Sequence, residues 1–179
     1  MDESGEAMKQ KKLVLDKNYH NVQILLKNFR KFSEMVQRKG NKIQKKFKNE
    51  TGKELTEYLD SPSSQRTEFA RSSLNSDIEE LRKLTSLLAI VTNAAEEMLN
   101  SGVKSWQDEY KVLWFTYLDK NYHSLPERLD LISEEFGYSV DKHYYYRILH
   151  EAEKEIENRI FMFFTRDMIE LMYRIVEEE

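Results

Sequence analysis

The chain of 179 residues has no cysteine, which excludes disulfide bonds and thiolate metal sites and fits a reducing cytosol. It has only five glycines and two prolines, so few residues are available for tight turns and long loops. No uncharged apolar run approaches the roughly 18 residues that span a bilayer. Residues 1–6 are acidic and lack the basic and apolar regions of a secretory signal. We therefore expect a soluble, cytoplasmic, all-α protein that does not contact membranes.

The chain does contain many apolar and aromatic residues. Hydrophobic residues make up 40% of the sequence and aromatic residues 12%, more than a disordered chain carries. The length allows one domain, or one domain with an extension, and is sufficient to bury a core. A globular fold is therefore predicted.

Charge is distributed unevenly along the chain. The net charge is −4, yet residues 9–48 hold 13 basic residues against two acidic ones, while residues 49–179 hold 15 basic against 27 acidic. A segment with such an excess is typical of an arm or helix that faces a polyanion, because local potentials act within about a Debye length. A solvated helix face, or a basic helix packed on the acidic remainder, explains the same pattern.

Apolar spacing in the N-terminal half predicts two long helices. The first extends from about residue 9 to residue 38, is interrupted near Gly40, and ends by residues 49–52. A Pro-containing loop at 60–64 precedes the second helix, over 74–98, whose apolar residues recur every three or four positions. We predict that the two form an antiparallel helical hairpin over residues 1–103, with an intermolecular coiled coil as the alternative.

The next stretch has shorter elements. A helix with an aromatic face is predicted over 105–118. Ser124 and Glu127 form the pattern of a capping box, which begins a helix that Gly137 ends. Two short helices around a glycine-containing turn are the outline of a helix-turn-helix, so we predict such a module over 104–179. The aromatic face of the helix predicted over 105–118 consists of Trp106, Tyr110, Leu113, Trp114, Tyr117 and Leu118.

The last stretch, from Lys142 to about Val176, contains no glycine or proline. It is predicted as one bent helix or as two, with Asp167 as a candidate cap for the second. Residues 160–176 are too apolar to remain uncovered on a small module. Packing against the long N-terminal helices explains this, and a homodimer through the C-terminal apolar helix is the alternative.

The helix that begins at Lys142 separates two kinds of side chain. Its apolar side is predicted to hold Tyr145, Ile148, Leu149, Ala152, Ile156, Ile160 and Phe163. The opposite side holds His143, Arg147, His150 and Lys154, with Lys142 and Tyr146 flanking them. Arg and Lys can reach base edges or phosphates, Tyr can bond a phosphate, and a helix N-terminus attracts one. The acids Glu151, Glu153, Glu155 and Glu157 are placed on the flanks or further along. Any amphipathic helix has polar residues opposite its core, so the stripe alone does not settle the function.

Residues 105–160 carry seven basic and 12 acidic residues, which is unfavourable for a module that binds DNA unaided. Two hypotheses follow. In the first, the basic N-terminal segment supplies phosphate contacts, for which the candidates are Lys39, Lys42, Lys45, Lys46 and Lys48. In the second, the main partner is a protein. A DNA-packaging role like that of a small terminase subunit is a third hypothesis.

Several runs carry a resemblance to a known family. They are residues 110–119, the stretch from Leu125 to Ser139, residues 145–148 with Ala152, and residues 25–32. Together they resemble the ArpU-type phage regulators of late transcription and, more distantly, region 4 of sigma factors. The resemblance implies a regulator that binds double-stranded DNA at a late promoter of a phage or prophage and helps host RNA polymerase to start there.

One spacing departs from the family pattern. The family commonly has about eleven residues between the Ser cap of the recognition helix and the alanine that matches Ala152, whereas Ser139 is thirteen away. Asp141 is eleven away. We therefore predict that Asp141 caps the recognition helix and that Lys142 is its first helical residue.

Other chemistry is not indicated by the sequence. The four histidines have no cysteine or carboxylate at metal-site spacing, and there is no Gly-rich phosphate loop, HExxH motif or nucleophile elbow. We expect no enzyme activity, no metal and no cofactor.

Overall fold

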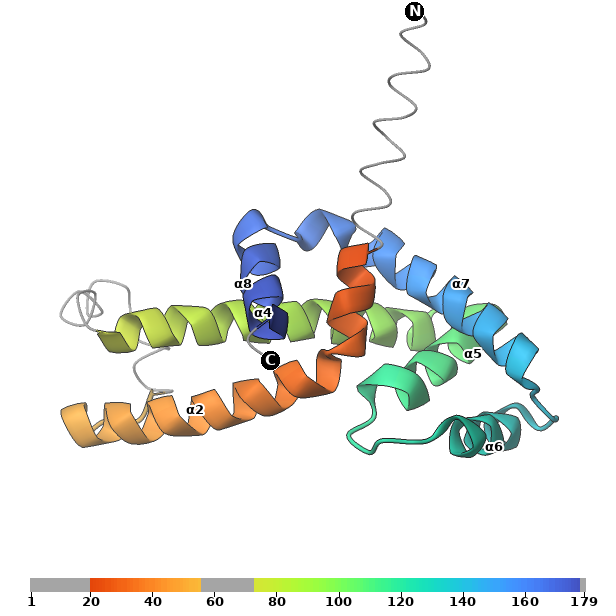
Figure 1. Ribbon diagram of the computed structural model, residues 1–179, viewed down its shortest axis with the longest axis horizontal. Helices are drawn as coiled ribbons and strands as arrows, with labels where there is room; N and C mark the ends of the chain where they lie inside the picture. Colours follow the sequence, from red (N-terminus) through yellow and green to blue (C-terminus); the bar gives the residue numbers. More distant parts are fainter. Residues whose placement is uncertain (1–19, 56–72, 178–179) are drawn as a thin grey trace, which may run out of the picture. The chain divides into compact units, whose positions relative to one another are not determined.

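The computed structural model describes residues 20–55 and 73–177 (Figure 1). Every regular element in these ranges is a helix, which confirms the all-α prediction. None of these helices has the length and apolar character that a membrane span requires. The chain divides into two compact units: unit 1 comprises Met1–Arg30 and Ala89–Glu179, and unit 2 comprises Lys31–Leu88. Each unit is described by itself.

The first described helix is interrupted earlier than expected. A helix over 20–27 is followed by a turn at Asn28, and α2 (Phe29–Thr51) then runs through Gly40 without a break. The predicted interruption near Gly40 is therefore wrong. The Asn28 side chain donates a hydrogen bond to the Ile24 carbonyl oxygen at 2.8 Å, and such local bonds compete with regular helix. A single glycine costs a helix only about 1 kcal/mol relative to alanine, which packing can offset.

Unit 2 is built by parts of α2 and α4 (Ser73–Asn100), whose residues up to Leu88 belong to it. Lys39 Nζ and Glu80 Oε1 form an ion pair at 2.7 Å between these helices. Gly52, with φ of 70°, follows the end of α2, as the sequence indicates. The predicted helix over residues 9–19 and the loop at 60–64 lie outside the described residues. The apolar cluster of unit 2 comprises Ile43, Phe47, Leu55, Leu74 and Ile78, with Leu81 packed against it.

In unit 1, α5 (Lys104–Leu113) continues directly into a π-helical turn, η3 (Trp114–Leu118). The predicted helical stretch to residue 118 is confirmed, but some of its side chains do not lie on the face expected for them. Because a π turn contains more residues than an α turn, the later positions of the turn rotate relative to the expected face, and Thr116, which was not expected on that face, is buried. Trp114, which we expected on that face with Leu113, is 40% exposed.

Short polar bonds fix the ends of α6 (Leu125–Phe136) and the start of α7 (Lys142–Ile160). The Ser124 backbone N–H donates to Glu127 Oε2 at 2.7 Å, and this bond lowers the pKa of Glu127. Gly137 ends α6 with φ of 74°, a conformation that other residues rarely adopt. The Tyr144 N–H donates to Asp141 Oδ1 at 2.7 Å, so the prediction of Asp141 as the cap is confirmed.

Helices α5, α6 and α7, whose positions can be followed in Figure 1, contribute side chains to one core. Tyr145 is completely buried within it, and its hydroxyl lies 2.8 Å from Thr116 Oγ1 and accepts a hydrogen bond from Arg128 Nη1 at 2.9 Å. These bonds fix which face of α7 points inward. The buried members of the core are Val112, Ile132, Val140, Tyr145, Ile148 and Leu149.

The C-terminal stretch forms two helices. After α7 come a 3₁₀ turn, η4 (Phe161–Phe163), and α8 (Arg166–Glu177). Thr165 caps α8, because its Oγ1 accepts the Met168 N–H at 3.3 Å, so the prediction of Asp167 as the cap is wrong. The apolar face of α8 is buried within the chain at Leu171, Met172 and Ile175. Tyr173 also donates a hydrogen bond to Asn21 Oδ1 at 2.9 Å.

Candidate nucleic-acid interface

The side of α7 that faces away from the core carries the six residues predicted from the sequence. All of them are exposed to solvent: Lys142, His143, Tyr146, Arg147, His150 and Lys154. Of the apolar side, Phe163 alone does not fit, because it lies in the 3₁₀ turn beyond the end of α7 and is 58% exposed. The structure thus brings the six residues together on one surface of one helix.

The N-terminus of α7 is less favourable for an anion than the sequence suggested. The Asp141 carboxylate already accepts the Tyr144 N–H there and places a negative charge at the helix end. Phosphate contacts at this end would therefore come from side chains such as Lys142 and not from the helix terminus. This corrects the expectation that the terminus itself attracts a phosphate.

Tyr144 lies against Arg147 and Tyr138 lies against Tyr144, and neither tyrosine was among the predicted site residues. The Arg147 guanidinium carbon lies 4.8 Å from the centre of the Tyr144 ring. The Tyr144 and Tyr138 hydroxyls are 3.1 Å apart, and this hydrogen bond raises the pKa of Tyr138 to about 12. The signal available in the sequence was the i, i+3 spacing of Tyr144 and Arg147, which places two side chains on one helix surface.

A hollow with acidic walls lies beside Arg147, between α5 and α7. Its acidic residues are Asp108, Glu109 and Glu151. Burial, together with the negative charges of Glu155 and Glu151, raises the pKa of Glu109 to about 7. Arg147 nevertheless forms no ion pair or hydrogen bond with any residue in the described ranges, so its N–H donors are not engaged there.

Glu153 is not a flanking surface charge, as was expected, but a buried residue. It is 5% exposed, and its two carboxylate oxygens accept hydrogen bonds from the Tyr117 hydroxyl at 2.7 Å and from Gln23 Nε2 at 3.0 Å. A buried carboxylate is tolerated when its oxygens are bonded in this way. Glu153 therefore belongs to the packing of α7 and not to its outer surface.

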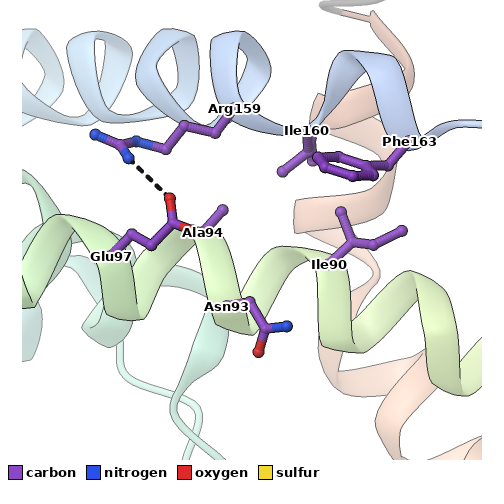
Figure 2. A pocket seen from close by; sticks show the side chains of 7 residues that line it. All are labelled: Ile90, Asn93, Ala94, Glu97, Arg159, Ile160 and Phe163. Carbon is purple, nitrogen blue, oxygen red and sulfur yellow. Dashed lines mark hydrogen bonds and ion pairs between the residues drawn. The ribbon is translucent and has the colours of Figure 1, made fainter.

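The C-terminal end of α7 has a different arrangement. Arg159 forms ion pairs with Glu97 at 3.0 Å and with Glu155 at 2.7 Å, and it lies 4.7 Å from the centre of the Trp106 ring. Figure 2 shows the Arg159–Glu97 pair beside a small hollow, where the Phe163 ring lies above Ile90 of α4. This end of α7 holds the helix to α4.

The candidate lysines of α2 belong to unit 2. Lys42 and Lys45 are exposed, and neither has an ion-pair partner among the residues that the structure covers. Lys39 is paired with Glu80, and Lys48 is paired with Glu54. Lys46 is half-buried. The five candidate phosphate contacts therefore differ in how readily they could reach a ligand.

No group of three potential metal-ligating side chains is found in the two described ranges. Comparison of the chain with models of known families, with curated proteins and with solved structures finds no match. The assignment of a function therefore rests on the residues of the candidate interface.

Proposed function

We propose that the protein binds duplex DNA and that the outer face of α7 enters the major groove. The observation that carries this proposal is the row of His143, Arg147, His150 and Lys154, which extends over three turns of α7 on its solvent-exposed side. Such a face on the second of two helices joined by a tight turn is the arrangement that helix-turn-helix proteins use. The core that α5 shares with α6 and α7 supports it, because it fixes the orientation of this face.

The more specific proposal is a transcription regulator of phage or prophage late genes that acts with host RNA polymerase. It is supported by the resemblance of the chain to ArpU-type regulators and to region 4 of sigma factors. In this proposal, Lys42 and Lys45 of the helical hairpin add phosphate contacts that carry no sequence information.

The test is a selection of binding sites from a random duplex library, followed by salt titrations on the selected site. Three contacts are removed in the variant Lys142→Ala/Arg147→Ala/Lys154→Ala. The matched control, Lys104→Ala/Lys120→Ala/Arg166→Ala, has the same net charge and loses three cations from other exposed positions.

We expect the first variant to lose site selection and to flatten the slope of log K against log salt by up to about 2.7, at about 0.9 per phosphate contact. The control should bind like the wild type. Equal losses in both variants, or a wild-type protein without salt-sensitive binding, would contradict the proposal.

A second candidate function is an adaptor that binds RNA polymerase and contacts DNA only weakly. The observation that favours it is the acidic wall of Asp108, Glu109 and Glu151 beside Arg147, which repels phosphate. Purified, nuclease-treated bacterial RNA polymerase distinguishes the two. An adaptor binds it without DNA and loses this binding when the three acids are changed to their amides.

A further inference from the structure

We propose that Tyr144 is a positioning residue for Arg147: its ring holds the guanidinium in place while leaving the N–H donors of that group available to a base edge. This inference rests on the proposed DNA-binding function and adds a specificity-determining residue to it. Tyr144 itself is not required to touch DNA.

The first step is the geometry of the pair. The Arg147 guanidinium carbon lies 4.8 Å from the Tyr144 ring centre, within the range of a cation–π interaction. The ring attracts the cation through its face, so this contact uses none of the five N–H donors of the guanidinium. A carboxylate partner in the same place would occupy two of them.

The second step is that the Tyr144 ring is itself fixed. Its backbone N–H is bonded to the Asp141 cap, and its hydroxyl is bonded to Tyr138. The two rings meet edge to face, with their centres 6.2 Å apart, and Tyr138 packs in turn on Phe136. The ring also packs on the core that α5, α6 and α7 share. A ring held from several sides limits the freedom of the side chain that lies on it.

The third step concerns the carboxylates that could bind the Arg147 guanidinium in place of DNA. Asp108, Glu109 and Glu151 line the same hollow, yet none of these carboxylates forms an ion pair with Arg147. Without the ring, the flexible guanidinium could turn to one of these carboxylates. Its donors would then be engaged within the protein, and a guanine would have to displace the acid.

Three variants and one control test the inference. Tyr144→Leu removes the ring but keeps an apolar side chain against the core, whereas Tyr144→Phe keeps the ring and loses only the hydroxyl. Tyr144→Leu is also made in the Arg147→Ala background. The matched control is Trp106→Leu, which removes the ring beneath the other arginine of α7. Thermal melts establish that each variant is folded.

Two measurements are made. Side-chain NMR of the free protein reports the Arg147 Nε–Hε resonance, which we expect to be shifted upfield by the ring in wild type and in Tyr144→Phe and to lose this shift in Tyr144→Leu. Titrations with the selected site and with random duplex give the ratio of the two affinities. We expect Tyr144→Leu to lower this ratio roughly two- to fivefold. Tyr144→Phe, which keeps the ring but loses one of its contacts, should lower it less than Tyr144→Leu does, and Trp106→Leu should leave it unchanged.

The double variant separates positioning from a general loss of stability. Tyr144→Leu should have no further effect on the affinity ratio once Arg147 is alanine, because its effect passes through that side chain. An additive effect, an unchanged ratio in Tyr144→Leu, or a resonance without a ring shift overturns the inference and leaves the proposed function intact. Failure of the proposed function is recognised separately, as a wild-type protein that selects no site, and the inference then falls with it.

Discussion

Helix α7 carries two arginines whose surroundings differ. Arg147 and Arg159 both lie over an aromatic ring, at 4.8 and 4.7 Å from its centre. Arg159 is also paired with two carboxylates, and its side chain is only 19% exposed. Arg147 is exposed and has no such partner in the described ranges. The same residue type thus holds the protein together at one end of α7 and is available to a ligand at the other.

The difference shows that an exposed cation is informative only when its neighbours are known. An arginine between two carboxylates has its charge compensated and its donors occupied, so a phosphate gains little by approaching it. An arginine that lies on an aromatic ring keeps its charge uncompensated and its hydrogen-bond donors available.

The largest effect is expected from the adjacent tyrosines of α7. Tyr145→Ala should lower the free energy of unfolding by about 3–5 kcal/mol, because a fully buried ring is lost from the shared core. Replacing Tyr146 by alanine should lower stability by at most about 1.5 kcal/mol, because this residue is 48% exposed and its main ring contact is the edge-to-face pair with Tyr145, with ring centres 5.0 Å apart. Urea unfolding of both variants gives the comparison. Similar losses at the two positions would show that the outward face of α7 has been assigned incorrectly.

Replacing Arg147 should mainly weaken DNA binding, whereas replacing Arg159 should mainly lower stability. Arg147→Ala is expected to weaken binding to the selected DNA site by roughly 1–3 kcal/mol and to lower the free energy of unfolding by at most about 1 kcal/mol, through its ring contact alone. Arg159→Ala should leave the DNA affinity unchanged and lower the free energy of unfolding by about 1–2 kcal/mol, through the lost ion pairs and ring contact. A loss of DNA affinity in Arg159→Ala equal to that in Arg147→Ala would remove the distinction.

Glu109 should make stability depend on pH. Its folded pKa of about 7 lies above the ordinary value of 4.5, so its ionisation opposes folding increasingly as the pH rises from about 4.5 through 7. Glu109→Gln should therefore be more stable than wild type by about 1 kcal/mol at pH 8, after allowance for its partial exposure. The difference should vanish at pH 4. Denaturation at both pH values measures it, and Glu134→Gln on the exposed side of α6 is the control.

The smallest effects are expected among the lysines of α2. Lys42→Ala and Lys45→Ala should each flatten the salt slope of DNA binding by about 0.9, because each removes one phosphate contact. Lys39→Ala should change the slope less, since Lys39 is paired with Glu80 at 2.7 Å. Salt titrations that show the same change for all three would mean that the ion pair does not restrict Lys39.

Sequence patterns were most informative at helix ends. The Glu127 bond to the Ser124 backbone and the Gly137 stop depend on neighbouring residues in the chain, whereas the Asp141 cap was predicted from the family spacing to Ala152; all three are found where they were predicted. Local hydrogen bonds of this kind involve only a few successive residues, so their pattern is visible in one dimension.

Other features could not be predicted in the same way. The break at Asn28 and the Thr165 cap involve polar residues whose side chains bond to the backbone in some contexts and not in others. The π turn at residues 114–118 has no spacing signature, and it buries Thr116, which was not expected on the buried face. Glu153 has the charge of a surface residue, and only its two distant hydrogen-bond donors explain its burial.

The sequence by itself determined that the described chain is helical, where α6 ends and α7 begins, and which side of α7 is apolar, because helical periodicity and caps are local properties. Only the tertiary structure decided which charges are compensated. Asp108 and Glu109 lie about forty residues before Arg147 in the chain, and Glu97 lies 62 residues before Arg159. Packing between helices therefore determines which of the two arginines keeps its hydrogen-bond donors available to a partner.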